Sequence, residues 1–130
     1  MRIESIQTRV ILAVEDNEAN RMLIQAVLER LGHVVLLAGS ASEAISRIEH
    51  RRPDLILMDI QLPGQDGLAL TRRLKADPEF APIPVVAITA HAMASDRQDC
   101  LDAGCAGYIA KPFNTRTLGA QIQEFLQPAS

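Results

Sequence analysis

The sequence predicts an α/β fold in which a parallel five-stranded sheet is covered by helices on both faces. Five strand-like segments alternate with five helix-like segments along 130 residues, which is the pattern of a doubly wound (βα)5 chain. The strand-like segments are continuously apolar, as expected for a sheet that is buried on both sides. No repeat or linker interrupts the pattern, so we expect one domain over residues 1–130, with its core at about 9–126.

Each element has a local justification, starting with the first two units. The expected strands are residues 10–14, 34–38, 55–58, 85–89 and 108–110. The expected helices are residues 17–31, 41–50, 67–75, 93–103 and 115–126. In the first helix, the residues with the spacing of one buried face are Met22, Leu23, Ala26, Val27 and Leu31. Gly32 suits the position after that helix ends, and Ser40 with Glu43 forms a capping box that opens the second helix.

The later elements carry similar signals. Asp66 can accept the first amide hydrogens of the third helix, although Gly67 in its first turn weakens that prediction. Pro84 must lie at the start of the fourth strand or outside its ladder, because it has no amide hydrogen to donate. Asn114 can cap the last helix. The expected apolar face of that helix is Leu118, Ile122, Phe125 and Leu126.

Composition excludes several classes of function. A net charge of −3 offers no electrostatic basis for binding nucleic acid directly. No apolar segment approaches the roughly 20 residues needed to span a bilayer, and the start lacks a signal-peptide pattern. We therefore expect a cytoplasmic protein without a membrane partner. Cys100 and Cys105 fit two reduced, small apolar residues near the end of the fourth helix.

Reactive side chains follow four of the five strands. Glu15 and Asp16 follow the first strand, Asp59 follows the third, Thr89 ends the fourth, and Lys111 follows the fifth. In the flavodoxin-like strand order 2-1-3-4-5, the first and third strands are central neighbours, and ligands bind beyond their carboxyl ends. The second strand then lies at an edge, and nothing reactive follows it. We expect these side chains to share one mouth of the sheet.

The loop after the first strand indicates which ligand binds there. A loop that recognises a nucleotide or flavin phosphate is rich in Gly, Ser and Thr. Here the loop reads Glu15-Asp16-Asn17-Glu18, which repels a bare phosphate and attracts a cation. Oxygen-only ligation suits Mg²⁺, or Mn²⁺, beside a phosphoryl group. Clustered carboxylates resist ionising together, so without metal at least one should have a raised pKa.

Asp59 is the candidate for the reacting group, because it ends the most apolar central strand. A rigidly held, partly desolvated carboxylate can attack an activated phosphoryl donor and form an acyl phosphate. Lys111 offers a positive charge and Thr89 a hydroxyl donor to the transferred phosphoryl oxygens. An ionised carboxylate needs no general base, so these residues suffice for the transfer.

Two turns flank this predicted site. The Lys111–Pro112 bond lies in a tight turn between strand and helix, where a cis X–Pro bond is expected; a trans proline that opens a helix is the alternative. A cis turn would fix the Lys111 backbone so that its amine reaches the site. On the other side, Gln61-Leu62-Pro63-Gly64-Gln65-Asp66-Gly67 is typical of a turn-rich loop beside Asp59.

Together these residues resemble the response-regulator receiver domain, the CheY-like phosphoacceptor of two-component signalling. The resemblance covers about residues 9–126. The motifs that carry it are Val14-Glu15-Asp16-Asn17, Met58-Asp59-Ile60-Gln61-Leu62-Pro63-Gly64-Gln65-Asp66-Gly67, Ile88-Thr89-Ala90 and Lys111-Pro112-Phe113. The first loop and Thr89-Ala90-His91-Ala92-Met93 are most similar in wording to DivK-type single-domain regulators and to the receivers of hybrid histidine kinases.

The resemblance implies roles for the acidic residues. Asp59 is the expected phosphorylated residue and a metal ligand, and Asp16 is a direct Mg²⁺ ligand. Glu15 stands where many receivers have Asp, and its longer side chain is expected to act on the metal through water. The Gln61 carbonyl oxygen is expected to be a further ligand.

The resemblance also implies the residues that read the phosphate. Thr89 and Lys111 are expected to bind the phosphoryl group, with Thr89 and Tyr108 acting as the switch pair. Thr89 reaches the phosphate only if its loop moves inward, which leaves space for Tyr108. An ordinary amphipathic strand residue is the alternative for Tyr108. Gln61 and His91 occupy variable positions that tune phosphate lifetime.

Partners follow from the same resemblance. The expected phosphoryl donor is a histidine kinase or a histidine phosphotransfer protein. The expected downstream target is a protein that binds the face made by the fourth helix, fifth strand and fifth helix. No substrate turnover is expected, and the chain is either a stand-alone regulator or a receiver excised from a hybrid histidine kinase.

Three other functions can be compared with the same residues. An aspartyl-phosphate phosphohydrolase has a second Asp two residues after the nucleophile, where this chain has Gln61. An unphosphorylated docking module does not need the intact acids and Lys111. A flavodoxin-like cofactor carrier does not fit the acidic first loop.

Overall fold

A computed structural model describes residues 8–62, 65–90 and 94–126 of the chain. The main sheet has five parallel strands in the order β2-β1-β3-β6-β7, which is the doubly wound order predicted from the sequence. Its strands are β1 (Val10–Val14), β2 (Val34–Ala38), β3 (Leu55–Asp59), β6 (Val85–Thr89) and β7 (Gly107–Ala110). A short antiparallel pair, β4 (Gln61–Leu62) and β5 (Gln65–Asp66), lies between β3 and the helix that follows.

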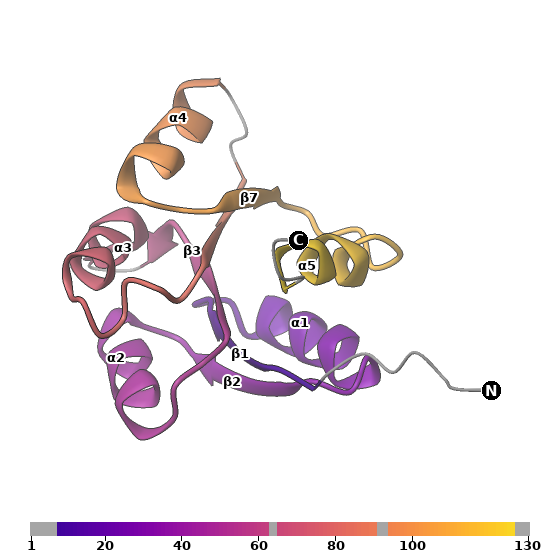
Figure 1. Cartoon of the computed structure of the whole chain (residues 1–130). Helices are drawn as coiled ribbons and strands as arrows, with labels where there is room; N and C mark the ends of the chain where they lie inside the picture. The colour runs from indigo at the N-terminus through magenta and orange to yellow at the C-terminus, as the bar shows by residue number, and fades with distance from the viewer. Residues whose placement is uncertain (1–7, 63–64, 91–93, 127–130) are drawn as a thin grey trace.

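Helices cover both faces of the sheet, as Figure 1 shows. Their bounds are α1 (Glu18–Arg30), α2 (Ala41–His50), α3 (Gly67–Ala76), α4 (Ala94–Ala103) and α5 (Leu118–Leu126). The helices α1 and α5 pack on one face, and α2, α3 and α4 pack on the other. Two apolar clusters therefore sandwich the sheet, and every residue of β3 and β6 is buried.

The helix caps follow the sequence signals. Ser40 accepts a hydrogen bond from the Glu43 amide at the start of α2, and Asp66 accepts one from the Leu68 amide at the start of α3. Gly32 has a φ of +93°, which suits the left-handed position after the end of α1. The apolar residues of α5 are placed as predicted, with three of them fully buried: Leu118, Ile122 and Leu126.

The predicted buried face of α1 is partly wrong: Val27 packs against the apolar cluster on that side of the sheet, but the centre of the buried face lies elsewhere. The two fully buried residues of α1 are Ile24 and Leu28, whereas Met22 is 62% exposed and Ala26 is also exposed. Six of the seven residues from Met22 to Leu28 are apolar, so no polar face marks the phase of the helix in this segment. Packing against the sheet decides the phase instead.

The start of the last helix also differs from the prediction. Helix α5 begins at Leu118, three residues after the expected start at Thr115. Asn114 ends the preceding loop with a turn, since its side chain accepts from the Arg116 amide and its carbonyl accepts from the Leu118 amide. The predictions for Pro63, Gly64, His91 and Met93 fall outside the described residues, as does the tail 127–130.

The two cysteines are free and buried, as expected for reduced small apolar residues. Cys100 lies on the inner side of α4 and Cys105 just beyond it, where both join the apolar cluster under that helix. Burial raises the pKa of the Cys100 thiol and raises that of Cys105 to about 11. Both thiols are therefore protonated at neutral pH and behave as core side chains.

Candidate functional site

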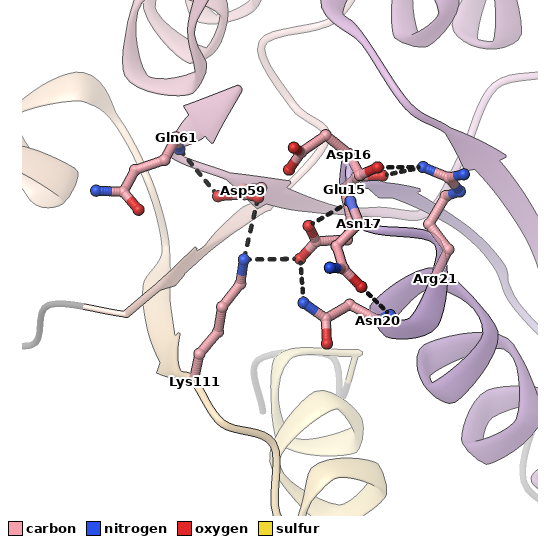
Figure 2. Close-up of polar contacts among 8 residues, drawn as sticks. All are labelled: Glu15, Asp16, Asn17, Asn20, Arg21, Asp59, Gln61 and Lys111. Atoms are coloured by element: carbon pink, nitrogen blue, oxygen red, sulfur yellow. Dashed lines mark hydrogen bonds and ion pairs between the residues drawn. The ribbon is translucent and has the colours of Figure 1, made fainter. Parts of the chain in front are cut away.

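Four predicted site residues meet at the carboxyl edge of the sheet. Glu15 and Asp16 follow β1, Asp59 is the last residue of β3, and Lys111 follows β7. One carboxylate oxygen from each of Glu15, Asp16 and Asp59 lies within 4.8 Å of the others. Parallel pairing of β1 with β3 brings these acids together, because Val14 is in register with Met58. Figure 2 shows the acids and the Lys111 amine directed toward one another.

Lys111 bridges two buried carboxylates. Its Nζ atom lies 2.9 Å from Glu15 Oε1 and 3.1 Å from Asp59 Oδ2. Glu15 is fully buried and Asp59 is 1% exposed, while 19% of the Lys111 side chain reaches solvent. A buried carboxylate is stable only when it is paired or hydrogen-bonded. Lys111 therefore supplies the positive charge that the two acids require in the metal-free protein.

Glu15 has further partners on the first turn of α1. Its Oε2 accepts a hydrogen bond from the Asn17 amide at 3.1 Å, and its Oε1 accepts a weaker one from Asn20 Nδ2 at 3.4 Å. Asn17 also caps α1, since its side chain accepts from the Asn20 amide. Both oxygens of Glu15 are thus occupied, whereas the Asp16 side chain is exposed at the mouth of the site.

The electrostatics of the cluster agree with the sequence expectation of one raised pKa. Burial, with the hydrogen bond and charge of Glu15, raises the pKa of Asp59 to about 6, although the Gln61 amide and Lys111 oppose the shift. Burial alone lowers the pKa of the Lys111 ammonium. The hydrogen bonds and charges of Glu15 and Asp59 outweigh that effect and raise the pKa above its ordinary value.

The loop after Asp59 packs directly against its backbone. The Gln61 amide donates to Asp59 Oδ1 at 2.9 Å, and Figure 2 shows the Gln61 side chain directed away from the cluster. Gly67 donates to the Ile60 carbonyl, and a Cβ atom added at Gly67 would lie 2.1 Å from the Asp59 carbonyl oxygen. The glycine that weakened the prediction of α3 is therefore required there by this close approach.

The remaining predicted residues lie on β6 and β7. Thr89 is buried at the end of β6, and its carbonyl accepts a hydrogen bond from the Lys111 amide at 2.8 Å. The Lys111–Pro112 bond is cis, the isomer that the turn predicts. Tyr108 lies within β7, away from the acids, and is half-buried with the guanidinium of Arg97 5.6 Å from its ring centre.

Sequence reasoning missed two residues in the first turn of α1: Asn20, whose Nδ2 donates to Glu15 Oε1, and Arg21. Arg21 Nη1 donates to the Glu15 carbonyl at 2.7 Å and to the Asp16 carbonyl at 2.9 Å. Its position in a helical segment gave no indication of this contact. The only signal that could have found it is the spacing, since the first turn of a helix lies beside the loop that precedes it.

The donor set fits a small divalent cation. Three carboxylates each place an oxygen atom within 4.8 Å of the others, and such ligands suit Mg²⁺ or Mn²⁺ better than softer metals. No other His, Cys, Asp or Glu cluster of this kind occurs in the described part of the chain. No helix of residues 8–62, 65–90 or 94–126 is both long and apolar enough to cross a membrane.

Comparison with known proteins gives consistent similarities. Residues 11–123 match the model of the response regulator receiver domain. The polar-differentiation response regulator DivK of Brucella ovis is 40% identical over 122 residues, which cover 94% of this chain and 99% of DivK.

Solved structures are similar over the same region. The receiver domain of the sensor histidine kinase PA1611 from Pseudomonas aeruginosa, solved with a magnesium ion coordinated in its active-site cleft, is 39% identical with a TM-score of 0.82. The match covers 92% of this chain and 98% of that one. Chemotaxis protein CheY4 from Vibrio cholerae, at 24% identity and a TM-score of 0.85 over 91% of this chain and 98% of its own, shares the fold.

Proposed function

The chain belongs to the family of response regulator receiver domains of two-component signalling, and on that premise we propose that it accepts a phosphoryl group on Asp59. The observation that carries this proposal is the position of the Asp59 carboxylate. It is buried at the end of a central strand, with an ammonium 3.1 Å away and two other carboxylates converging on it. We assign the receiver to residues 1–130 as one domain, with its core at about 9–126.

The transfer needs no proton acceptor on the chain. A carboxylate oxygen of Asp59 forms a bond to the phosphorus of a phosphohistidine, and the phosphorus–nitrogen bond breaks as the imidazole leaves. The product is an acyl phosphate on Asp59 and a neutral histidine on the donor after its proton balance is restored from solvent. The proposed donor is a histidine kinase or a histidine phosphotransfer protein, and the proposed location of the reaction is the cytoplasm.

The site has the groups to hold a divalent cation during this step. Asp16, Asp59 and the Gln61 carbonyl oxygen would hold Mg²⁺ or Mn²⁺ directly, and Glu15 would act through water. The cation would supply positive charge next to the phosphoryl oxygens. Lys111 is already directed at Asp59 and can bind a transferred phosphoryl oxygen by a small shift from Glu15. Thr89 supplies a hydroxyl donor from the end of β6.

The output is a change in the surface formed by α4, β7 and α5. A phosphoryl group adds negative charge and acceptor oxygens beside Thr89, which draws Thr89 inward and gives Tyr108 room to turn. Leu101, which is 54% exposed on α4, and Tyr108 on β7 lie on this surface. An exposed leucine and a half-buried tyrosine on the elements of one surface suit a protein partner. His91 and Gln61 would set the lifetime of the phosphoryl group.

An alternative with the same phosphoacceptor activity is that the chain is a receiver domain from a hybrid histidine kinase. The 39% identity with the receiver of a sensor histidine kinase supports this alternative to the same extent as the 40% identity with DivK supports a stand-alone regulator. The two alternatives predict different partners, a separate kinase in one case and a covalently linked kinase in the other. Sequencing the gene with its flanking regions separates them directly.

Phosphorylation is tested by mass spectrometry on the intact chain. We expect incubation with Mg²⁺ and acetyl phosphate to add one phosphoryl group, and EDTA or Asp59→Asn to abolish the addition. Asp54→Asn is the matched control, because Asp54 precedes β3 at the end of the strand remote from the site, where its side chain accepts a hydrogen bond from the Val10 amide. Equal labelling of the Asp59→Asn variant would exclude Asp59 as the acceptor. Repeated turnover of a small phosphomonoester would instead indicate a phosphohydrolase.

A further inference from the structure

Arg21 joins the first turn of α1 to the acidic loop that precedes it. A single guanidinium nitrogen, Nη1, donates to two consecutive backbone carbonyls, those of Glu15 and Asp16. Both hydrogen bonds are short, at 2.7 and 2.9 Å, and a charged donor makes them stronger than neutral ones. The carbonyls of this loop are therefore held toward α1.

In the loop after β1, the backbone carbonyls and the Asp16 carboxylate point in opposite directions. Figure 2 shows the Arg21 guanidinium on the side of the Asp16 backbone that is remote from the Asp16 carboxylate. When the carbonyls are held toward Arg21, rotation of the peptide units is restricted and the Asp16 side chain is kept at the mouth of the site. Of the three clustered acids, Asp16 alone is exposed, so its side chain depends most on the backbone for its position.

A second loop closes the space around the guanidinium. A Cβ atom added at Gly39, just after β2, would lie 3.0 Å from Arg21 Nη1 and 3.2 Å from Glu43 Oε1. Glu43 Oε1 is itself fixed by a 2.7 Å hydrogen bond from the Gly39 amide. The Arg21 guanidinium thus bonds the loop after β1 and lies close to Gly39 in the loop after β2. This gives the edge strand β2 a part in the site, although nothing reactive follows it.

We propose that Arg21 is a positioning residue for the divalent cation, acting through the backbone of Glu15 and Asp16. This inference rests on the proposed function, because it presumes that the acidic cluster binds the cation. Arg21 carries a positive charge, and that charge by itself repels a cation. The positioning effect and the charge effect of Arg21 therefore have opposite signs, which makes the inference testable by the direction of change alone.

The decisive variant is Arg21→Met, which keeps the length of the side chain and removes both the charge and the donors. We expect Mg²⁺ affinity to fall about tenfold, as is usual when a residue that orients metal ligands is lost. Affinity is measured by isothermal titration with MgCl₂, and the Asp16 amide resonance is followed in parallel by NMR. Arg30→Met is the matched control, because Arg30 is an exposed residue of the last turn of the same helix.

Two further variants separate positioning from general stability. Arg21→Lys keeps a charged donor and should bind Mg²⁺ more tightly than Arg21→Met. Gly39→Ala should weaken Mg²⁺ binding in the same direction by crowding Nη1, and should add little in the Arg21→Met background, because both changes act on one contact. The melting temperature of each metal-free variant is recorded, and we expect a loss of affinity in variants that remain fully folded at the titration temperature.

The outcomes distinguish this inference from the proposed function. If the wild-type chain binds no Mg²⁺, the proposed function is wrong, and the positioning role of Arg21, which rests on it, is wrong as well. If the wild type binds and Arg21→Met binds equally well or more tightly, the positioning role is wrong and the proposed function stands. A loss of affinity shared by Arg30→Met would also overturn the positioning role, since it would assign the effect to helix α1 as a whole.

Discussion

Lys111 lies closer to Glu15 than to the proposed phosphoacceptor, at 2.9 Å from Glu15 Oε1 against 3.1 Å from Asp59 Oδ2. The Glu15 carboxylate meets this ammonium from the loop after β1, whereas that of Asp59 meets it from the end of β3. Glu15, Asp59 and Lys111 therefore form a triad in which one cation is shared by two buried anions. If either carboxylate is removed, Lys111 pairs with the other one alone, which changes the electrostatic environment of the remaining carboxylate.

The first prediction concerns that balance. In Glu15→Gln, the pKa of Asp59 should fall below about 6, because the hydrogen bond and charge of Glu15 both raise it and Lys111 then serves Asp59 alone. The measurement is a ¹³C NMR titration of the Asp59 carboxyl group in EDTA. Glu18→Gln is the control, since Glu18 is an exposed residue at the start of α1. An unchanged or higher pKa in Glu15→Gln would contradict the triad.

The second prediction is a pH dependence of stability. The pKa of Asp59 is raised from 3.8 to about 6, so the folded protein binds this proton more tightly than the unfolded chain. The favourable contribution of the protonated form is present below about pH 4 and is lost as the pH rises to about 6. Without metal, ionised Asp59 then lowers the free energy of unfolding by roughly 3 kcal/mol.

Asp59→Asn isolates this contribution, because asparagine stays neutral at every pH of interest. Its advantage in unfolding free energy over the wild type should grow from near zero at pH 4 to a plateau above pH 6. Urea unfolding in EDTA across this range measures the difference. An advantage that is constant with pH would assign the effect to packing.

The third prediction concerns the close approach of α3 to the acceptor strand. Gly67→Ala places a Cβ atom 2.1 Å from the Asp59 carbonyl oxygen, so the start of α3 or the end of β3 must move. We expect a loss of several kcal/mol of stability or failure to fold. Gly32→Ala is the comparison: its Cβ meets nothing within 4 Å, so the cost of the φ of +93° alone should be about 1–2 kcal/mol. Thermal unfolding measures the loss of stability in both variants. Equal losses would show that the contact between the added Cβ and the Asp59 carbonyl oxygen is relieved without cost.

Much of this fold and site could be predicted from the sequence. The continuously apolar segments located the main strands, and the strand order then brought Glu15, Asp16, Asp59 and Lys111 to one edge. Residue type and chain order are sufficient for such conclusions, because parallel strands align their carboxyl ends.

Features that depend on phase or backbone direction could not be predicted. The run from Met22 to Leu28 is apolar on nearly every side, so only packing shows that Ile24 and Leu28 face the sheet. The contact of Arg21 depends on which way two carbonyls point, which no residue type encodes. The β4–β5 pair depends on a two-residue ladder that is too short to leave a periodic pattern.

The fourth prediction concerns the proposed switch. The Arg97 guanidinium lies 5.6 Å from the centre of the Tyr108 ring, a contact worth about 0.5–1 kcal/mol at an exposed site. In Arg97→Gln this contact is lost, so Tyr108 should sample its inward position more often without phosphate. We expect its ring resonances to shift part of the way toward those of the phosphorylated wild type.

The control for this switch experiment is Gln98→Ala, the exposed neighbour of Arg97 on α4. Tyr108 resonances that are identical in Arg97→Gln and the wild type would show that Arg97 does not restrain the ring.

Tyr108 also provides an intrinsic spectroscopic probe. It is the single tyrosine of the chain, and the chain has no tryptophan. Any tyrosine absorbance or fluorescence of the isolated protein therefore comes from Tyr108 alone. This residue lies on β7, the strand that joins the phosphate-binding end of the sheet to the proposed output surface. A near-ultraviolet spectrum thus reads the environment of the proposed switch in the unlabelled protein. Time-resolved emission could follow that environment during phosphorylation, without a dye and without a mutation.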